Sequence, residues 1–265
     1  MPIMPMRFRK LSGPMALAII AIFLLAGAGH AATLASHRVL YLLKGESKGT
    51  VAIDGEMAFE TVDVCDGWTV KQQTMLRVAG PGSETRSLIS STSWESKDGR
   101  HFRFERSTRR DGVLVEKTGG RAEMTEDGGG TVILSGTDAP EIALPPGTLF
   151  PSRHTAELVD LAKRGERFFL RVIFDGSAGD VPNRVSAVIG NPRELPGLAD
   201  PSATVIAWPV RLAFFPIDKD SSTPEVEIAV LMQEDGVARE IELDYPDMTV
   251  FGKLAKFIPL PAAPC

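Results

Sequence analysis

One serine of this chain lies in a setting that resembles that of a catalytic nucleophile. Ser177 belongs to the segment Asp175-Gly176-Ser177-Ala178-Gly179, which follows a run of apolar residues. The α/β-hydrolases place their nucleophile in the pattern G-x-S-x-G between a strand and a helix. Here Asp175 takes the place of the first glycine, and no helical pattern follows. The segment is therefore predicted to be a hairpin loop, and Ser177 is not predicted to be catalytic.

The histidines and clustered acidic residues do not have the spacing of metal ligands. The histidines after residue 31 are His37, His101 and His154. None of them has another His, Cys or carboxylate at the distance along the chain that a metal site requires. Asp218 and Asp220, with Glu225 beyond them, depart from the calcium-loop pattern and are predicted to form a solvated turn. We expect His154 to bond a backbone carbonyl or to pack, and we predict no catalytic residue, metal or cofactor.

Two cysteines remain as candidates for covalent chemistry. Cys65 lies in the turn-like segment Cys65-Asp66-Gly67-Trp68, and Cys265 is the final residue of the sequence. An even, minimal number of cysteines in an exported chain suggests one disulfide. Such a bridge would bring the C-terminal segment beside the N-terminal one, so we expect the first and last strands to be neighbours.

Five arginines gather between residues 100 and 110 of an otherwise acidic chain. Strand alternation would place Arg100, Phe102, Phe104 and Arg106 on one face. If that face lines a partly open cavity, the arginines would meet an anionic head group while the rings meet an acyl chain. The alternative is that the arginines pair with acidic residues across the strands of a solvated face.

The N-terminus has the three parts of a secretion signal. Arg7, Arg9 and Lys10 precede the apolar run from Met15 to Ala28, and small residues follow up to Ala31. We predict a signal peptide over residues 1–31 that is cleaved after Ala31, with cleavage after Ala28 as the second choice. An uncleaved anchor is disfavoured because a membrane-spanning helix needs about 20 apolar residues.

The remaining residues, 32–265, are predicted to form a single domain. They contain no linker rich in Pro, Gly or Ser, and the expected disulfide would span them. With 26 Lys and Arg against 34 Asp and Glu, their net charge is about −8. This balance argues against attraction to nucleic acid or to an anionic membrane.

Alternating apolar and polar residues predict strands through most of this domain. The pattern is clear at residues 102–105, 225–230 and 241–245, and Asp-Gly turns lie at residues 98–99, 111–112 and 235–236. Residues 168–174 and 204–215 are more continuously apolar, as in strands buried on both faces. Pro209 within the latter implies an edge strand or a bulge. Residues 151–164 have helical spacing with Gly165 as a C-terminal cap, and are predicted to be the main helix.

Several segments together resemble those of a known family. They are Cys65-Asp66-Gly67-Trp68, Ser93-Trp94-Glu95-Ser96-Lys97-Asp98-Gly99, Gly147-Thr148-Leu149-Phe150-Pro151 with His154, Trp208-Pro209-Val210-Arg211, and the terminal Cys265. In order and spacing the chain resembles the EipB family of periplasmic cell-envelope integrity proteins. The resemblance implies a mainly β fold, with a long antiparallel sheet rolled into an open β-spiral or incomplete barrel and one helix against it. It also implies a disulfide between Cys65 and Cys265, and it supplies no catalytic residue.

Two classes of function are consistent with these observations. The first is a non-enzymatic periplasmic protein that is soluble after signal cleavage and binds an envelope lipid, a lipoprotein or a periplasmic protein. It would support cell-envelope integrity and stress resistance. The second is a hydrolase that acts on envelope material. We favour the first because the sequence contains no credible catalytic set.

The predicted signal can be tested on the expressed protein. Material released by osmotic shock is expected to begin at Ala32, and intact-mass measurement would identify this start. A species that keeps Met1 and sediments with membranes would contradict the prediction.

Overall fold

The computed structural model describes residues 34–47, 51–136, 141–177 and 181–261, together with residues 263 and 265. The chain divides into two compact units, Met1–His30 and Ala31–Cys265, and every described residue belongs to the second. The predicted signal peptide, residues 1–31, lies outside the described residues, so its cleavage stays a prediction. Among the described helices, none is long and apolar enough to cross a bilayer.

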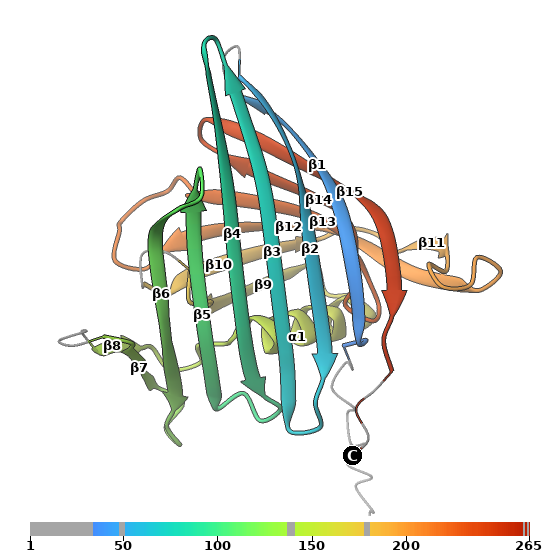
Figure 1. The fold of residues 1–265 in the computed structure, drawn as a ribbon. Coiled ribbons are helices and arrows are strands. Elements are labelled where there is room, and N and C mark those ends of the chain that lie inside the picture. The colour runs from blue at the N-terminus through green and yellow to red at the C-terminus, as the bar shows by residue number, and fades with distance from the viewer. Residues whose placement is uncertain (1–33, 48–50, 137–140, 178–180, 262, 264) are drawn as a thin grey trace, which may run out of the picture. The chain divides into compact units, whose positions relative to one another are not determined.

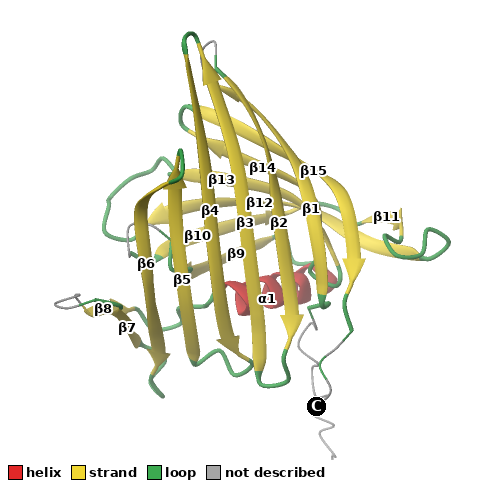
Figure 2. Ribbon diagram, viewed as in Figure 1, coloured by secondary structure: helices red, strands yellow, loops and turns green. Residues whose placement is uncertain are grey.

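The second unit contains one antiparallel sheet of 15 strands and the helix α1 (Pro151–Lys163), as Figures 1 and 2 show. The strands before the helix are β1 (His37–Ser47), β2 (Ala52–Asp63), β3 (Gly67–Gly80), β4 (Ser83–Ser96), β5 (His101–Arg110), β6 (Val113–Met124), β7 (Gly130–Leu134) and β8 (Glu141–Leu144). Those after it are β9 (Phe168–Ile173), β10 (Asn183–Ile189), β11 (Arg193–Pro196), β12 (Thr204–Pro216), β13 (Val226–Gln233), β14 (Ala238–Tyr245) and β15 (Met248–Pro259). The mainly β fold with one main helix is confirmed.

The first and last strands are neighbours, as expected. The sheet order is β8-β7-β6-β5-β4-β3-β2-β1-β15-β14-β13-β12-β10-β9, and β11 pairs with β12 outside this path. β1 and β15 pair from His37 opposite Pro259 to Ser47 opposite Met248. Since β8 and β9 are the two ends of this path, the sheet is open.

The edge strand β9 is covered by the segment that follows β8. The backbone N–H of Leu149 donates to the carbonyl of Val172 at 2.9 Å, and the N–H of Phe174 donates to the carbonyl of Leu149 at 3.0 Å. These bonds satisfy backbone groups that an edge strand would otherwise expose. They also bring the two ends of the sheet close to one another without a direct strand pair between β8 and β9.

The local signals for turns are confirmed. The interpretation of Pro209 as an edge residue is wrong, whereas a bulge lies opposite it, because residues 190–192 face only Trp208 and Pro209 between β10 and β11. The three Asp-Gly pairs join β4 to β5, β5 to β6 and β13 to β14. Pro209 lies inside β12 opposite Leu231 of β13, with no shift of register there. On the other side its partner changes from β10, which ends at Ile189, to β11, which begins at Arg193. The carbonyl of Pro209 points to that side, toward the N–H of Gly190. A residue without an N–H is tolerated there because the ladder is interrupted.

The helix α1 ends where the sequence predicted. Gly165 has φ of +80°, its N–H donates to Ala162, and the N–H of Glu166 donates to Leu161. This is a Schellman motif, in which a residue with positive φ satisfies the last carbonyls of the helix.

The helix lies against one face of the sheet, here called the inner face. Leu158 and Ala162 pack with Phe169 of β9 and Trp208 of β12, whereas Val159 packs with Trp68 of β3. These clusters place α1 between two parts of the sheet that are far apart in strand order, in agreement with Figure 2. Burial of these apolar side chains on both sides of α1 fixes its position.

The disulfide joins the turn between β2 and β3 to the C-terminal segment. Cys65 and Cys265 are bonded, with their Cα atoms 5.7 Å apart and 200 positions between them in the sequence. Cys65 has φ of +68°, and its N–H donates to the carboxylate of Asp63. The bridge therefore spans nearly all of the described fold.

Replacement of Cys265 by Ser is expected to lower the melting temperature. Loss of a native bridge typically costs about 2–5 kcal/mol. At about 2–4 °C per kcal/mol for a domain of this size, the decrease should be about 4–20 °C in a calorimetric scan. Reduction of the native protein should reproduce this decrease and should not affect the variant. Two free thiols in the denatured, unreduced native protein would contradict the bridge.

Candidate functional site

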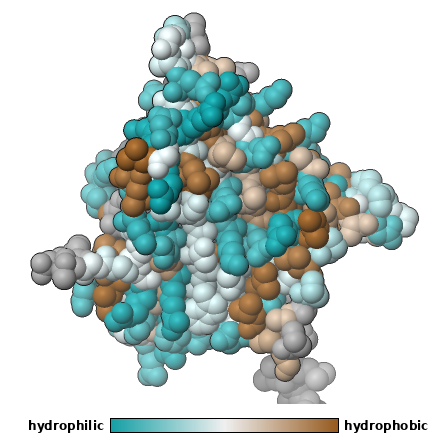
Figure 3. All heavy atoms as spheres, in the orientation of Figure 1, coloured by the Kyte–Doolittle hydropathy of each residue, from teal (hydrophilic) through white to brown (hydrophobic). Residues whose placement is uncertain are grey.

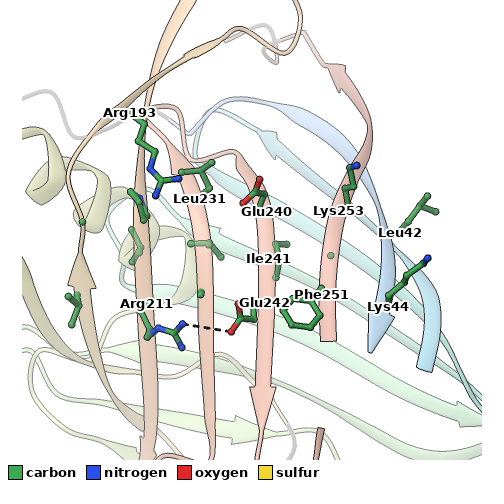
Figure 4. Close-up of a pocket in the computed structure, with 17 residues that line it drawn as sticks. Leu42, Lys44, Arg193, Arg211, Leu231, Glu240, Ile241, Glu242, Phe251 and Lys253 are labelled. Carbon is green, nitrogen blue, oxygen red and sulfur yellow. Dashed lines mark ion pairs between the residues drawn. The ribbon is translucent and has the colours of Figure 1, made fainter. Parts of the chain in front are cut away.

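A large groove lies on the face of the sheet opposite α1, here called the outer face. It encloses about 1000 Å³ and crosses six adjacent strands, β10, β12, β13, β14, β15 and β1, with Arg193 of β11 at one end. Its apolar side chains include Leu42, Val188, Leu231 and Phe251. Leu42 and Phe251 are 48% and 44% exposed, although both lie in the middle of long strands. We call this feature the outer-face groove (Figure 4).

Strand alternation explains why this groove combines apolar and charged groups. Tyr41 and Leu43 of β1 point to the inner face and are buried, so Leu42 and Lys44 point outward. In the same way Val250 is buried in the core while Phe251 lines the groove. The outward positions hold a mixture of residue types because inner-face packing does not constrain them.

The groove is locally basic although the chain is acidic. Its charged lining residues are Lys44, Arg193, Arg211, Lys253, Glu240 and Glu242, an excess of two positive charges. Arg211 bridges Glu242 at 3.7 Å, the pair marked in Figure 4, and Glu227 at 3.5 Å. Within the described part of the chain, Lys44, Arg193 and Lys253 form no ion pair within 4 Å, although Lys44 helps to lower the pKa of Asp54 and Lys253 lies opposite Glu240 in the sheet. An apolar floor with unpaired cations at its margin suits a ligand with an acyl chain and an anionic head group.

A buried carboxylate holds the N-terminus of α1 in place. The N-cap residue, Phe150, has no side-chain acceptor, and the first turn contains no acidic residue. Instead Glu95 of β4 accepts the backbone N–H of Ser152 at 2.7 Å through Oε2 and that of Arg153 at 2.7 Å through Oε1. These are two of the donors that a helix leaves unsatisfied at its start. A side chain 57 residues earlier in the sequence therefore provides the cap.

The burial of Glu95 changes its ionisation. The side chain is only 1% exposed, and burial raises its pKa to about 7. The N–H donors of Ser152 and Arg153 favour the charged form and oppose this rise. Glu95 therefore titrates near neutral pH at the junction of the sheet and the helix.

The four residues predicted to bind a ligand are not gathered around one opening. Phe102 and Phe104 lie on the inner face in a cluster of aromatic rings. Phe102 stacks on Phe150 with ring centroids 4.9 Å apart, and Phe104 packs edge-on against Phe174 with centroids 5.5 Å apart. Phe102 is 1% exposed. These rings are core residues because they close the space between the β5 end of the sheet and the end of β9.

The two arginines of that prediction have different surroundings. Arg100 lies in the turn before β5, and its guanidinium is 4.0 Å from Glu126. Arg106 is on the inner face, where its charge acts on Tyr245 of β14. Burial raises the pKa of Tyr245, and Arg106 opposes this rise. Ligand binding by Arg100, Phe102, Phe104 and Arg106 stays a prediction. Pairing of the arginines across the strands stays one too, because the Arg100–Glu126 contact joins two turns.

His154 is buried in the core. Of the two roles expected for it, packing is the one that the structure shows. Its ring stacks on Phe169 with centroids 5.1 Å apart, and its Nε2 has no hydrogen-bond partner. Burial lowers the pKa of His154 to about 4, and the charge of Arg171 acts in the same direction. The imidazole is therefore neutral at physiological pH.

The other residues considered as chemical groups lie in loops. Ser177 follows β9, and its backbone N–H donates to the carboxylate of Asp175 at 2.9 Å; Ala178 and Gly179 lie outside the described residues. Between β12 and β13, Glu225 is bonded to Lys219 at 2.5 Å. Both observations agree with the turns predicted for these segments.

Sequence reasoning missed Glu95 and the outer-face groove. A signal for Glu95 existed: the helix begins after Phe150 without a capping side chain, so an acceptor had to come from elsewhere. Leu42 and Phe251 gave a weaker signal, because apolar residues at outward positions of a strand are common.

Comparisons with known proteins agree on the family. The EipB-like family model matches residues 28–261. The chain is 31% identical over 247 residues to the cell envelope integrity protein EipB of Brucella abortus (strain 2308), covering 87% of this chain and 86% of that protein. It is also similar to a crystal structure of a beta-barrel-like protein of a domain of unknown function from Brucella abortus. That similarity has a TM-score of 0.80 and 28% identity, and it covers 87% of this chain and all of the other.

The raised pKa of Glu95 predicts a specific dependence of stability on pH. Between its ordinary pKa of 4.5 and its folded pKa of about 7, the folded state holds more protons on this group than the unfolded state. The free energy of unfolding should therefore fall as the pH rises through this window. Relative to Glu95→Gln, which does not titrate, the native protein is expected to lose stability from pH 4.5 to 7 and to show no further relative change above it.

Urea denaturation across this range measures the effect. Glu105→Gln, at an exposed carboxylate of β5, is the control and should not alter the profile. Glu95→Ala should lose about 1–3 kcal/mol for each N–H left without an acceptor. A difference between the native protein and Glu95→Gln that does not vary with pH would contradict the raised pKa.

Proposed function

Because the chain belongs to the EipB-like family, we propose that it is a periplasmic, non-enzymatic protein that supports cell-envelope integrity by binding an anionic amphiphile in the outer-face groove. The amphiphile is an envelope lipid or the acylated end of a lipoprotein. The observation that carries this proposal is the apolar groove of about 1000 Å³ with three unpaired cations at its margin.

The dimensions and the lining of the groove favour a lipid over a small polar metabolite. Ligand pockets of about 300–1000 Å³ bury most of a drug-sized molecule. Val188, Leu231 and Phe251 offer apolar contact along the groove, and each buried methylene of an acyl chain contributes about 0.8 kcal/mol. Lys44 and Lys253 can then bind a phosphate or carboxylate as point charges.

A periplasmic location is supported by two sequence features. Residues 1–31 have the pattern of a secretion signal, and the bridge between Cys65 and Cys265 suits an oxidising compartment. The relative from Brucella abortus is named as a cell envelope integrity protein, which agrees with a role in the cell envelope.

The proposal that the protein is not an enzyme rests on the surroundings of His154 and Ser177. His154 is neutral and stacked on Phe169, so it is poorly suited to act as a base on Ser177. Ser177 lies in a loop held by Asp175 rather than in a strand-to-helix elbow. Hydrolysis of envelope material is the outcome that would contradict this part of the proposal.

Mass spectrometry of an organic extract of the purified protein tests ligand binding. We expect a reproducible anionic lipid in the extract of the native protein. Phe251→Asp and Leu42→Asp should lose most of it because each places a charge on the apolar floor. Val113→Asp is the matched control, since Val113 is 65% exposed at the β5–β6 hairpin, away from the groove.

Complementation tests whether binding accounts for the cellular role. Deletion of the gene is expected to sensitise cells to detergents or cell-wall antibiotics. Ser177→Ala and Val113→Asp should restore resistance, whereas Phe251→Asp should not. Loss of complementation by a folded Arg100→Ala/Arg106→Ala variant, with Phe251→Asp active, would contradict binding in the outer-face groove and favour a site that involves these arginines. Hydrolysis by the native protein that Ser177→Ala abolishes would establish an enzyme.

A further inference from the structure

Nine outward-facing side chains on β3, β4 and β5 form a regular polar surface. The sheet register places them in three rows across the strands. The rows are Thr69-Trp94-Arg103, Lys71-Thr92-Glu105 and Gln73-Ser90-Ser107. We call these nine residues the hydroxyl face. Figure 3 looks onto this side of the molecule, where pale atoms of intermediate hydropathy run down the middle between hydrophilic flanks.

The hydroxyl face is hollowed. One groove of about 520 Å³ lies over β3–β5, and a second of about 360 Å³ extends from β4 to Arg38 of β1. Both are lined by Ser90, Ser91 and Thr92, so they meet over β4. Because neighbouring strands are about 4.8 Å apart, the combined channel from β1 to β5 spans about 19 Å across the strands. An extended chain of several rings fits such a channel.

The polar groups of this face are free to bind. Within the described residues, the hydroxyls of Thr69, Ser90, Thr92 and Ser107 and the amide of Gln73 make no side-chain hydrogen bond. A hydroxyl both donates and accepts, and an amide offers two donors and an acceptor. Serine is not among the residues enriched in strands, so its abundance in the centre of β4 is not explained by strand propensity.

Trp94 adds an aromatic surface at one end. Its ring lies close to Gly67 of β3, where a Cβ would come within 2.6 Å of the indole Nε1. Because Gly67 has no side chain, the indole ring can pack against the backbone of β3 at this position. Trp94 is half-buried, whereas the other two tryptophans, Trp68 and Trp208, are in the core. The guanidinium of Arg103 lies over the Trp94 ring, 5.3 Å from its centroid, so a ligand on that side meets the ring together with this guanidinium.

Three properties of the hydroxyl face disfavour a polyanion, a peptide strand and a lipid as its ligand. Glu60 pairs with Arg38 and lies 3.8 Å from Lys71, and Glu105 is 3.0 Å from Lys117. Arg38 and Lys71 share Glu60, and Lys117 is paired with Glu105, so among these cations Arg103 alone has no described ion pair, and a polyanion would also meet both carboxylates. The strands are interior to the sheet, so their backbone groups are already bonded and cannot add a peptide strand. Apart from Trp94, the nine residues offer no large apolar side chain to a lipid.

We propose that the hydroxyl face is a binding site for a neutral glycan strand. The glycan strand crosses β1–β5, with one sugar ring beside the Trp94–Arg103 pair and its hydroxyls bonded to Thr92 and Ser90 of β4 and to their neighbours on the adjacent strands. Aromatic rings present an apolar face to the C–H groups of a sugar, while hydroxyl and amide side chains match its O–H groups. This site is separate from the outer-face groove, whose residues lie on β10–β15 and β1.

Titration of the full mature protein with neutral hexasaccharides tests the proposal. The probes are the β-1,4-linked hexamers of glucose and of N-acetylglucosamine and the α-1,4-linked hexamer of glucose, and the readout is intrinsic tryptophan fluorescence. We expect saturable binding of at least one probe, and loss of its fluorescence change in Trp94→Phe. Thr92→Arg, at the centre of the face, should weaken binding by calorimetry about tenfold or more, equivalent to about 1.4 kcal/mol.

Ser83→Arg is the matched control because it adds the same side chain at the exposed far end of β4. It should bind like the native protein. Phe251→Asp should also bind the glycan normally, and Thr92→Arg should retain co-purified lipid, which separates this site from the outer-face groove. Absence of binding to every probe, equal loss in Ser83→Arg, or tighter binding of heparin than of the neutral hexamers would overturn the proposal.

Discussion

The pairing of β1 with β15 is the constraint on which the rest of the sheet depends. β2–β8 form one continuous meander and β9–β14 form the other part, and among the described strands the sheet runs from one part to the other through the pair of β1 with β15. Without that pair there would be two smaller sheets, each with a long exposed edge. The outer-face groove crosses this junction, since it is lined by Leu42 of β1 and Phe251 of β15. The proposed lipid site therefore exists only when the two parts are joined.

The helix connects the same two parts from the inner face. Glu95 binds its N-terminus from β4, while Leu158 and Ala162 pack against β9 and β12. The hydrogen bonds orient the helix at its start, and the apolar contacts fix its position along its length. Because the N–H of Ser152 is buried, loss of the carboxylate would leave it without an acceptor. Polar and apolar contacts thus act together to hold α1 against the inner face.

The sequence was sufficient to predict the fold but only part of the candidate sites. Alternation, Asp-Gly turns and the Gly165 cap depend on residues close in sequence, so they could be read directly. The expected disulfide between Cys65 and Cys265 predicted that the first and last strands are neighbours. Alternation also placed Phe102 and Phe104 on one face correctly, but could not indicate that Phe150 and Phe174 cover them. Such burial depends on segments that come together only in the folded sheet. The same is true of Glu95, whose partners lie 57 and 58 residues away.

The junction of β1 with β15 also sets an order of assembly. As the chain emerges from its N-terminal end, each strand from β2 to β8 meets its partner as the next strand appears. One edge of β1, in contrast, has no partner until about 200 further residues have followed. Contacts between such distant segments form slowly because a large loop must close first. Throughout that interval the apolar Val39, Tyr41 and Leu43 lie in an unfinished strand that could pair with another copy. We therefore expect the nascent chain to be most prone to pair with other copies before β15 has formed, and this risk to end when the 12 residues of β15 pair with β1.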